Sequence, residues 1–288
     1  MKNKTLNIVN KVRHRYWRVI YDRRIRQFLG DKIIVCMTFD TEEDWDLENR
    51  LYYNSFKYID SGALYELGCG LADRGISATF FVTTKVGKER PHVLTFLEEK
   101  GHAIGVHLHV HDLESCTRYP YRADEADAIT SYDKSKKIEY MRRAKSCLED
   151  LLTYEVVLYR SGRLQFDYET ERVAVRTGFK LFANRRGIYR MGNADLWNVG
   201  VGSCDLFEFC RVYNLNCFLS LFEKERAGQN VIVFSAHPMS LYDYSTESVH
   251  RERFNLLWLF IDTLLQQSHI VFCNQKNMVD ILKRYTGK

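Results

Sequence analysis

The 288-residue chain contains only three prolines and has no low-complexity tract. Flexible connections between domains are usually rich in proline, glycine and polar residues, so this composition argues against an internal linker. Hydrophobic residues make up 45% of the chain, which is enough for a large core. The sequence therefore predicts one globular domain over residues 31–288, preceded by an N-terminal segment of residues 1–30.

Long apolar runs are also missing. No stretch reaches the length of about 18 apolar residues that a membrane-spanning helix needs. The apolar core of a signal peptide is lacking as well, because Arg13, Arg15 and Arg18 interrupt the only candidate. None of the eight cysteines forms a Cys-x-x-Cys pair, which is typical of buried thiols in a reducing compartment. These features predict a cytoplasmic protein.

Positive charge is concentrated in residues 1–30, which contain nine Lys and Arg but only one acidic residue, Asp22. Their net charge of +8 exceeds the +5 of the whole chain, so the remaining residues carry a net charge of −3. Nucleic-acid phosphates require a basic surface, which a slightly acidic body does not offer. We therefore expect no nucleic-acid partner.

Apolar residues in the N-terminal segment recur at three- and four-residue spacing, with Lys and Arg between them. This periodicity predicts a basic amphipathic helix. Such a helix can lie on an anionic membrane, so residues 5–29 are a candidate for peripheral membrane contact. The same stripe could instead pack on the domain, and the sequence leaves both alternatives open. The apolar residues are Leu6, Val9, Val12, Tyr16, Val19 and Ile20.

From Lys32 onward, short apolar runs alternate with longer helical patterns. This alternation predicts an α/β fold with a parallel sheet, arranged as a barrel or as a doubly wound sheet. In both arrangements functional residues gather at the carboxyl ends of the strands. Residues 185–210 break the pattern and predict a loop or hairpin insertion near the site. The predicted strands are residues 33–39, 78–82, 103–107, 156–159, 180–183, 231–235 and 270–272.

Several carboxylates follow the first predicted strand, in residues 38–44, TFDTEED. Alternate side chains of an extended chain point the same way, so Asp40 and Glu42 can share one site. Acidic residues also follow strands simply because loops are polar, and this run alone does not decide between the two interpretations.

Histidines follow the third predicted strand. Residues 101–111 read GHAIGVHLHVH, with His107, His109 and His111 at alternate positions. Neutral imidazole is the commonest side-chain ligand for zinc and similar ions, so three histidines in five residues favour a metal site. A single histidine would more often be a loop or core residue.

In this order, the Asp after the first strand, the ATFFV strand of residues 78–82 and the histidine run resemble the polysaccharide deacetylase family, the NodB-like carbohydrate esterases. The resemblance covers residues 32–284 and implies a distorted (β/α)7-type barrel with parallel strands and outer helices. It also implies that two histidines four residues apart bind the metal, which here are His107 and His111. His109 would then be a supporting residue, and Asp40 matches the family's catalytic base.

The third metal ligand depends on how the acids are spaced. Thr41 stands where the family commonly has a second, metal-binding Asp. Some members space the two acids as Asp-x-Asp, which would make Glu42 the third ligand. Glu43 and Asp44 remain alternatives.

Two later motifs extend the resemblance. Residues 158–163, LYRSGR, are similar to the family's third motif, in which an Arg, here Arg160, orients and tunes the catalytic Asp. Residues 231–239, VIVFSAHPM, look like the family's closing strand, whose His acts as a general acid. His237 is the match.

The resemblance implies a metal-dependent hydrolase that removes an N-acetyl group from an amino sugar, with a divalent ion, zinc being the first choice. Because a secretion signal is not seen, the expected substrate is a glycan precursor within the cell. Two alternatives stay open: an amidase acting on another C–N bond, or a binding module that lost activity, which the Thr41 substitution motivates. The sequence makes no prediction about the oligomeric state.

Overall fold

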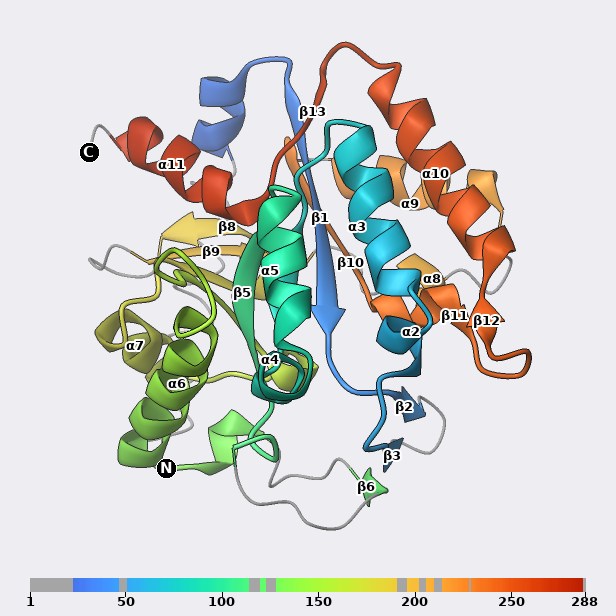
Figure 1. The fold of residues 1–288 in the computed structure, drawn as a ribbon. Helices are drawn as coiled ribbons and strands as arrows, with labels where there is room; N and C mark the ends of the chain where they lie inside the picture. Colours follow the sequence, from blue (N-terminus) through green and yellow to red (C-terminus); the bar gives the residue numbers. More distant parts are fainter. Residues whose placement is uncertain are drawn as a thin grey trace.

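The computed structural model describes residues 23–46, 51–113, 120–122, 128–190, 196–201, 206–209, 214–227 and 229–286. At its centre a parallel sheet curls into an incomplete barrel with helices packed on the outside (Figure 1). The strand order is β10-β1-β4-β5-β7-β8-β9, and β13 also pairs with β1. The predicted α/β fold with parallel strands and outer helices is confirmed.

Each strand predicted from the sequence is present. β8 extends seven residues past its predicted end, and every other end differs by at most two residues. β9 lies within the predicted irregular segment, residues 185–210, and was not among the predicted strands. The sheet consists of β1 (Ile33–Thr41), β4 (Thr79–Val82), β5 (Ala103–Leu108), β7 (Leu158–Ser161), β8 (Leu181–Arg190), β9 (Trp197–Gly200), β10 (Val231–Ala236) and β13 (Ile270–Phe272).

Helices cover the outside of the sheet, and several begin at a side chain that caps the first turn. Asp133, Asp167 and Asn214 each accept a hydrogen bond from a backbone N–H at the start of α6, α7 and α9. The helices are α2 (Lys57–Asp60), α3 (Ala63–Asp73), α4 (Thr84–Glu89), α5 (Pro91–Glu99), α6 (Lys134–Glu149), α7 (Tyr168–Arg176), α8 (Leu206–Phe209), α9 (Leu215–Arg226), α10 (Arg251–Leu265) and α11 (Gln275–Thr286).

Strand β1 runs through the middle of the sheet, and all nine of its residues are buried. Its alternate side chains enter two different apolar clusters. Val35, Met37 and Phe39 pack with the outer helices, whereas Ile34 and Cys36 pack with inward residues of other strands. This two-residue alternation, continued along the chain, directs Thr38, Asp40 and Glu42 to the inside of the barrel.

Two small sheets lie beyond the main one. β2 (Trp45–Asp46), β3 (Leu51–Tyr52) and β6 (Tyr121–Arg122) form an antiparallel sheet past the carboxyl end of β1 (Figure 1). β11 (Tyr242–Asp243) pairs with β12 (Ser248–Val249).

The segment predicted as a loop or hairpin insertion, residues 185–210, is described in part. Its first residues continue β8, and Gly187 to Arg190 pair in reverse order with Gly200 to Trp197 after a register shift. The buried amide of Asn198 donates to the carbonyls of Arg185 and Gly187, at 2.7 Å in each case. The described part therefore contains paired strands, as the hairpin alternative expected.

The N-terminal segment reaches the barrel at the amino ends of the strands. Residues 23–29 are helical and lie beside α11 (Figure 1). Ile25 is buried in one cluster with Ile34 and Leu282. The amphipathic stripe at residues 6–20 lies outside the described residues, so both alternatives for it stay open.

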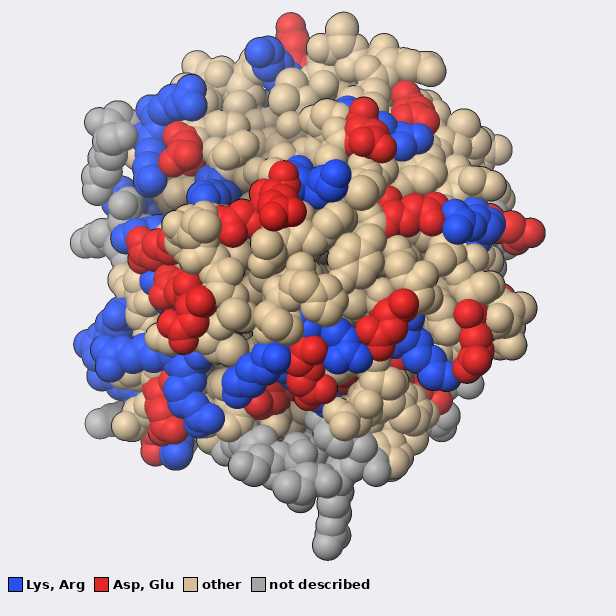
Figure 2. All heavy atoms as spheres, in the orientation of Figure 1, with Lys and Arg blue, Asp and Glu red and all other residues tan. Residues whose placement is uncertain are grey.

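Within the described ranges, no helix is long and apolar enough to span a membrane. On the face drawn in Figure 2, basic and acidic side chains of the described residues lie side by side.

Candidate metal and catalytic site

The carboxyl ends of four parallel strands bring the predicted site residues together. Inward positions alternate along β5, β7 and β10 as they do along β1, so apolar inward residues such as Leu158 and Val233 are followed by polar ones. This alternation accounts for the inward direction of His107, Arg160 and Ser235 at the same end of the sheet. The site is thus built where parallel α/β sheets usually bind their ligands.

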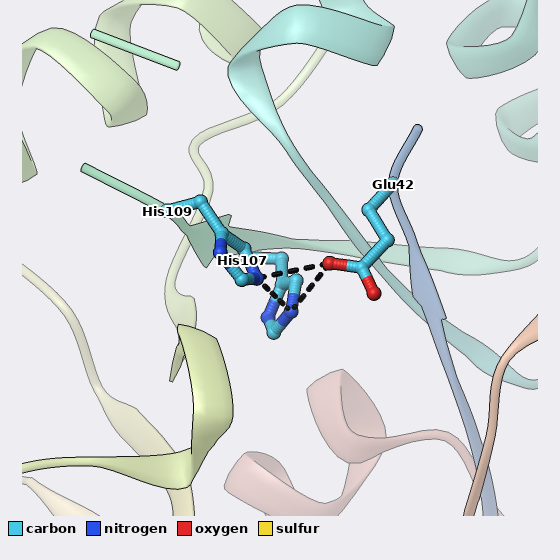
Figure 3. A group of neighbouring side chains, drawn as sticks. All are labelled: Glu42, His107 and His109. Carbon is cyan, nitrogen blue, oxygen red and sulfur yellow. Dashed lines mark hydrogen bonds and ion pairs between the residues drawn. The ribbon is translucent and has the colours of Figure 1, made fainter. Parts of the chain in front are cut away.

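Glu42 and two histidines form a compact buried group (Figure 3). The Nε2 atom of His109 lies 2.9 Å from Oε2 of Glu42, and that of His107 lies 3.6 Å from the same oxygen. The two Nε2 atoms are 3.1 Å apart. Burial alone would raise the pKa of Glu42, but His109, His107 and His237 outweigh it, and the pKa is lowered. Glu42 therefore stays ionised.

These three atoms fit a divalent ion. A tetrahedral ion with nitrogen and oxygen ligands at about 2.0–2.1 Å holds its ligand atoms roughly 3.3 Å apart, which is close to the three observed separations. Two histidines and one carboxylate also form a common ligand set of catalytic zinc. Both the spacing and the chemistry of the group are suited to holding a metal.

His111 belongs to a second, adjacent group. Its Nε2 atom lies 2.7 Å from Oε1 of Glu43 and 3.2 Å from Oδ1 of Asp112. Lys85 approaches the same oxygen of Glu43 at 3.9 Å. The structure therefore brings His107 together with His109 at Glu42, and it places His111, the other histidine expected from the family pattern, beside Glu43.

Asp44 is engaged elsewhere. Its carboxylate accepts hydrogen bonds from Ser55 Oγ at 2.6 Å, the Lys57 backbone N–H at 2.8 Å and Tyr244 Oη at 2.6 Å. Three donors hold the carboxylate away from the histidines, which makes Asp44 an anchor for the loop after β1. Tyr58 donates to the carbonyl of Glu42 at 2.7 Å and supports the same loop.

Asp40 forms a buried ion pair with Arg160. Nη1 of Arg160 lies 2.5 Å from Oδ1 of Asp40. Burial raises the pKa of Asp40, but the Arg160 guanidinium, with His107 and His237, more than offsets this effect and lowers the pKa below its ordinary value. Asp40 is therefore an ionised carboxylate beside the Glu42 group.

Arg160 is fixed by several contacts that the sequence did not suggest. Its Nη2 donates to Thr38 Oγ1 at 2.9 Å and its Nη1 to Ser235 Oγ at 3.3 Å. The guanidinium also stacks on Phe81, with 4.1 Å to the ring centroid. Thr38 and Ser235 lie on β1 and β10, two residues before Asp40 and His237. Because residues two apart point to the same face of a strand, this spacing could have predicted that both side chains enter the site.

His237 follows β10, and its side chain also lies beside Glu42. Its Nε2 atom lies 3.4 Å from Oε1 of Glu42, and its side chain, at 17% exposure, is more accessible than those of Glu42 and His109. Trp45 packs edge-on against His237, and Tyr52 packs against both Trp45 and His109. These two aromatic residues, from the small sheet beyond β1, were not predicted as site residues because their two-residue strands carry no periodic signal.

Comparisons with known proteins agree with this architecture. The family model for polysaccharide deacetylases matches residues 31–182, more than half of the chain. No curated protein sequence matches the chain.

Solved structures resemble the fold at low sequence identity. A Mycobacterium smegmatis structure assigned to the polysaccharide deacetylases has a TM-score of 0.69 at 15% identity, over 89% of this chain and 92% of that one. PuuE allantoinase has a TM-score of 0.59 at 15% identity, over 88% and 92%. A family 4 carbohydrate esterase from Streptomyces lividans has a TM-score of 0.52 at 11% identity, over 83% and 91%. The chain belongs to the polysaccharide deacetylase family.

Proposed function

We propose that this protein is a metal-dependent hydrolase that removes the N-acetyl group from an amino sugar in a glycan or glycan precursor. Family membership supports hydrolysis of the amide bond of an acylated glycan. Metal dependence is supported by the buried group of Glu42, His107 and His109, whose donor atoms have the spacing of a zinc ligand set.

We assign the metal to Glu42, His107 and His109. His111 is the alternative expected from the family pattern, but it lies beside Glu43 and Asp112. A divalent ion held by Glu42, His107 and His109 would act as a Lewis acid that activates water and polarises the amide carbonyl. Zinc is the first candidate, because two imidazoles and one carboxylate suit it.

Asp40 takes the role of general base. Its lowered pKa keeps it ionised, so it can accept a proton from the attacking water. Arg160 orients the Asp40 carboxylate through the 2.5 Å ion pair and is itself held by Thr38 and Ser235. A base that is fixed in this way requires little reorganisation when the water attacks.

His237 takes the role of general acid. The amine of the sugar is a poor leaving group and needs a proton as the C–N bond breaks. His237 follows β10, lies beside Glu42 and is more exposed than Glu42 and His109, so a substrate can reach it. The T-shaped contact with Trp45 restricts the orientation of its ring.

The test is acetate release from substrates that contain N-acetylglucosamine, measured with chelator-treated protein before and after addition of zinc, cobalt or manganese. We expect activity only after metal is restored. His111→Ala serves as the matched control for His109→Ala, and we expect only the latter to lose the metal. Absence of acetate release with every metal would refute the proposed function.

An amidase for a different C–N bond is the second candidate, because an allantoinase shares the fold. Release of ammonia or of a non-acetyl acid from small amides, without acetate release, would favour it. An inactive binding module is motivated by Thr41, a fully buried residue at the position where the family commonly has an acid. Wild-type protein that neither binds a divalent ion nor hydrolyses any amide would favour that reading.

We further propose that the substrate is a lipid- or nucleotide-linked precursor and that the protein is cytoplasmic, with peripheral membrane contact through residues 5–29. The +8 net charge of residues 1–30 supports contact with an anionic lipid surface, which would bring the site close to lipid-linked substrates.

A further inference from the structure

The loop that follows β7 approaches the proposed metal site at Gly162. A Cβ atom placed on Gly162 would lie 2.7 Å from Cε1, 2.8 Å from Nε2 and 2.9 Å from Nδ1 of His109. Real Cβ atoms essentially never come within 3.0 Å of another heavy atom in this way. The imidazole of His109 therefore occupies the space that any side chain at position 162 would need.

The backbone itself does not require glycine at this position. Gly162 does not belong to the glycines with positive φ. The left-handed conformations in this loop belong to the next two residues, Arg163 with φ 55° and Leu164 with φ 54°, and neither is glycine. If glycine served the turn, one of those two positions would benefit from it. The physical reason for glycine at 162 is therefore the contact with His109.

The His109 ring has little room to move away from an added methyl group. Its side chain is 2% exposed. The rings of Tyr52, His107 and His111 surround it, with centroid separations of 5.4, 4.7 and 5.3 Å. A displacement of the ring would also change the 2.9 Å separation between its Nε2 atom and Glu42.

We propose that Gly162 is a positioning residue of the metal site: the missing side chain lets His109 lie against the β7 loop and reach Glu42, which makes His109 a metal ligand of this chain. The inference rests on the proposed function, since it concerns the metal that the reaction uses. His111 cannot take this place without leaving Glu43, whose Oε1 lies 2.7 Å from its Nε2.

The size of the clash sets the expected effect. Relief of a 2.7 Å contact to the 3.4 Å of ordinary van der Waals contact requires a shift of about 0.7 Å. Metal–ligand distances tolerate deviations of only about 0.2 Å. Loss of a group that orients a ligand typically costs 10- to 100-fold in metal affinity. We expect a loss in this range for Gly162→Ala.

The experiment measures zinc affinity by competition with a chromophoric chelator for the full-length wild type, Gly162→Ala, His109→Ala and the double variant. Gly162→Ala should have a lower zinc affinity than the wild type. Removal of the His109 ring makes room for the added methyl, so the double variant should have the same zinc affinity as His109→Ala alone. Gly70→Ala is the matched control. Its Cβ would lie 2.5 Å from Trp258, away from the site, so it should lower thermal stability and leave zinc affinity unchanged.

Several results would overturn the inference. Unchanged zinc affinity of folded Gly162→Ala would refute it, and so would an equal loss in the presence and absence of the His109 ring. If Gly162→Ala does not fold, the double variant decides: a folded double variant supports the steric role of His109, whereas an unfolded one shows that glycine serves the backbone. Wild-type protein that binds no divalent ion would instead refute the proposed function.

Discussion

Replacement of Arg160 by Met is expected to destabilise the protein by about 3–5 kcal/mol, because it leaves a buried carboxylate without its counterion. Arg160 is completely buried, and Asp40 is 6% exposed. Methionine retains much of the apolar volume of the arginine side chain, so the loss comes from charge and hydrogen bonding, with little contribution from a cavity.

The structure allows the magnitude to be divided. The change removes the ion pair to Asp40 and the donors to Thr38 Oγ1, Ser235 Oγ and the carbonyl of Ala183. Asp40→Asn in turn leaves Arg160 as the uncompensated buried charge. Each single variant leaves one buried charge unpaired, whereas the double variant removes both charges. The double variant should therefore lose less stability than the sum of the two single losses, by about 1–3 kcal/mol.

Urea unfolding of chelator-treated protein provides the assay, since a bound metal would contribute its own stabilisation. For a domain of this size, a loss of 3–5 kcal/mol corresponds to a decrease in Tm of about 6–10 °C. A loss below about 1 kcal/mol for Arg160→Met, or additivity of the two single changes within about 0.5 kcal/mol, would contradict the reasoning.

Three further predictions concern other parts of the molecule. His237→Ala should retain metal content and lose turnover by about 10²- to 10⁴-fold, as expected for removal of a general acid, and full loss of bound metal would instead make it a ligand. Burial raises the pKa of Glu171 to about 7, with Arg185 offsetting part of the effect. The contribution of Glu171 to stability is therefore full below its unfolded pKa of about 4.3 and declines as the pH rises through 7. Glu171→Gln should thus increase the free energy of unfolding at pH 8 by up to about 3 kcal/mol relative to the wild type and leave it unchanged near pH 4. Urea unfolding at the two pH values measures this, and a difference that does not depend on pH would refute the raised pKa of Glu171. Full-length protein should co-sediment with anionic vesicles at low salt and less at high salt, whereas a variant starting at Asp31 should not; equal binding of both, with a loss of thermal stability on truncation, would mean that the segment is a structural part of the domain.

Much of the fold followed from sequence periodicity. β1 and β10 are continuous apolar runs because both faces of a central parallel strand are buried, and such runs stand out in a sequence. The rule that parallel strands share one carboxyl end predicted the edge of the sheet where the site lies, and the resemblance to the family implied that Asp40, His107 and Arg160 belong to it. By contrast, the two-residue strands that carry Trp45 and Tyr52 are too short to show a period, so the sequence did not indicate their place at the site.

Which neighbouring side chains meet was decided by tertiary contacts. His107, His109 and His111 alternate along one chain, and their spacing alone does not say which of them faces Glu42. The answer depends on residues far away in sequence: the bare backbone at Gly162 leaves room for the ring of His109, and Glu43 receives His111. In the same way, Asp44 is separated from Glu42 by its bonds to Ser55 and Tyr244. Local sequence determined the kinds of residue at the site and the edge of the sheet where they gather, whereas the pairing of individual donor atoms required the packing of distant segments against one another.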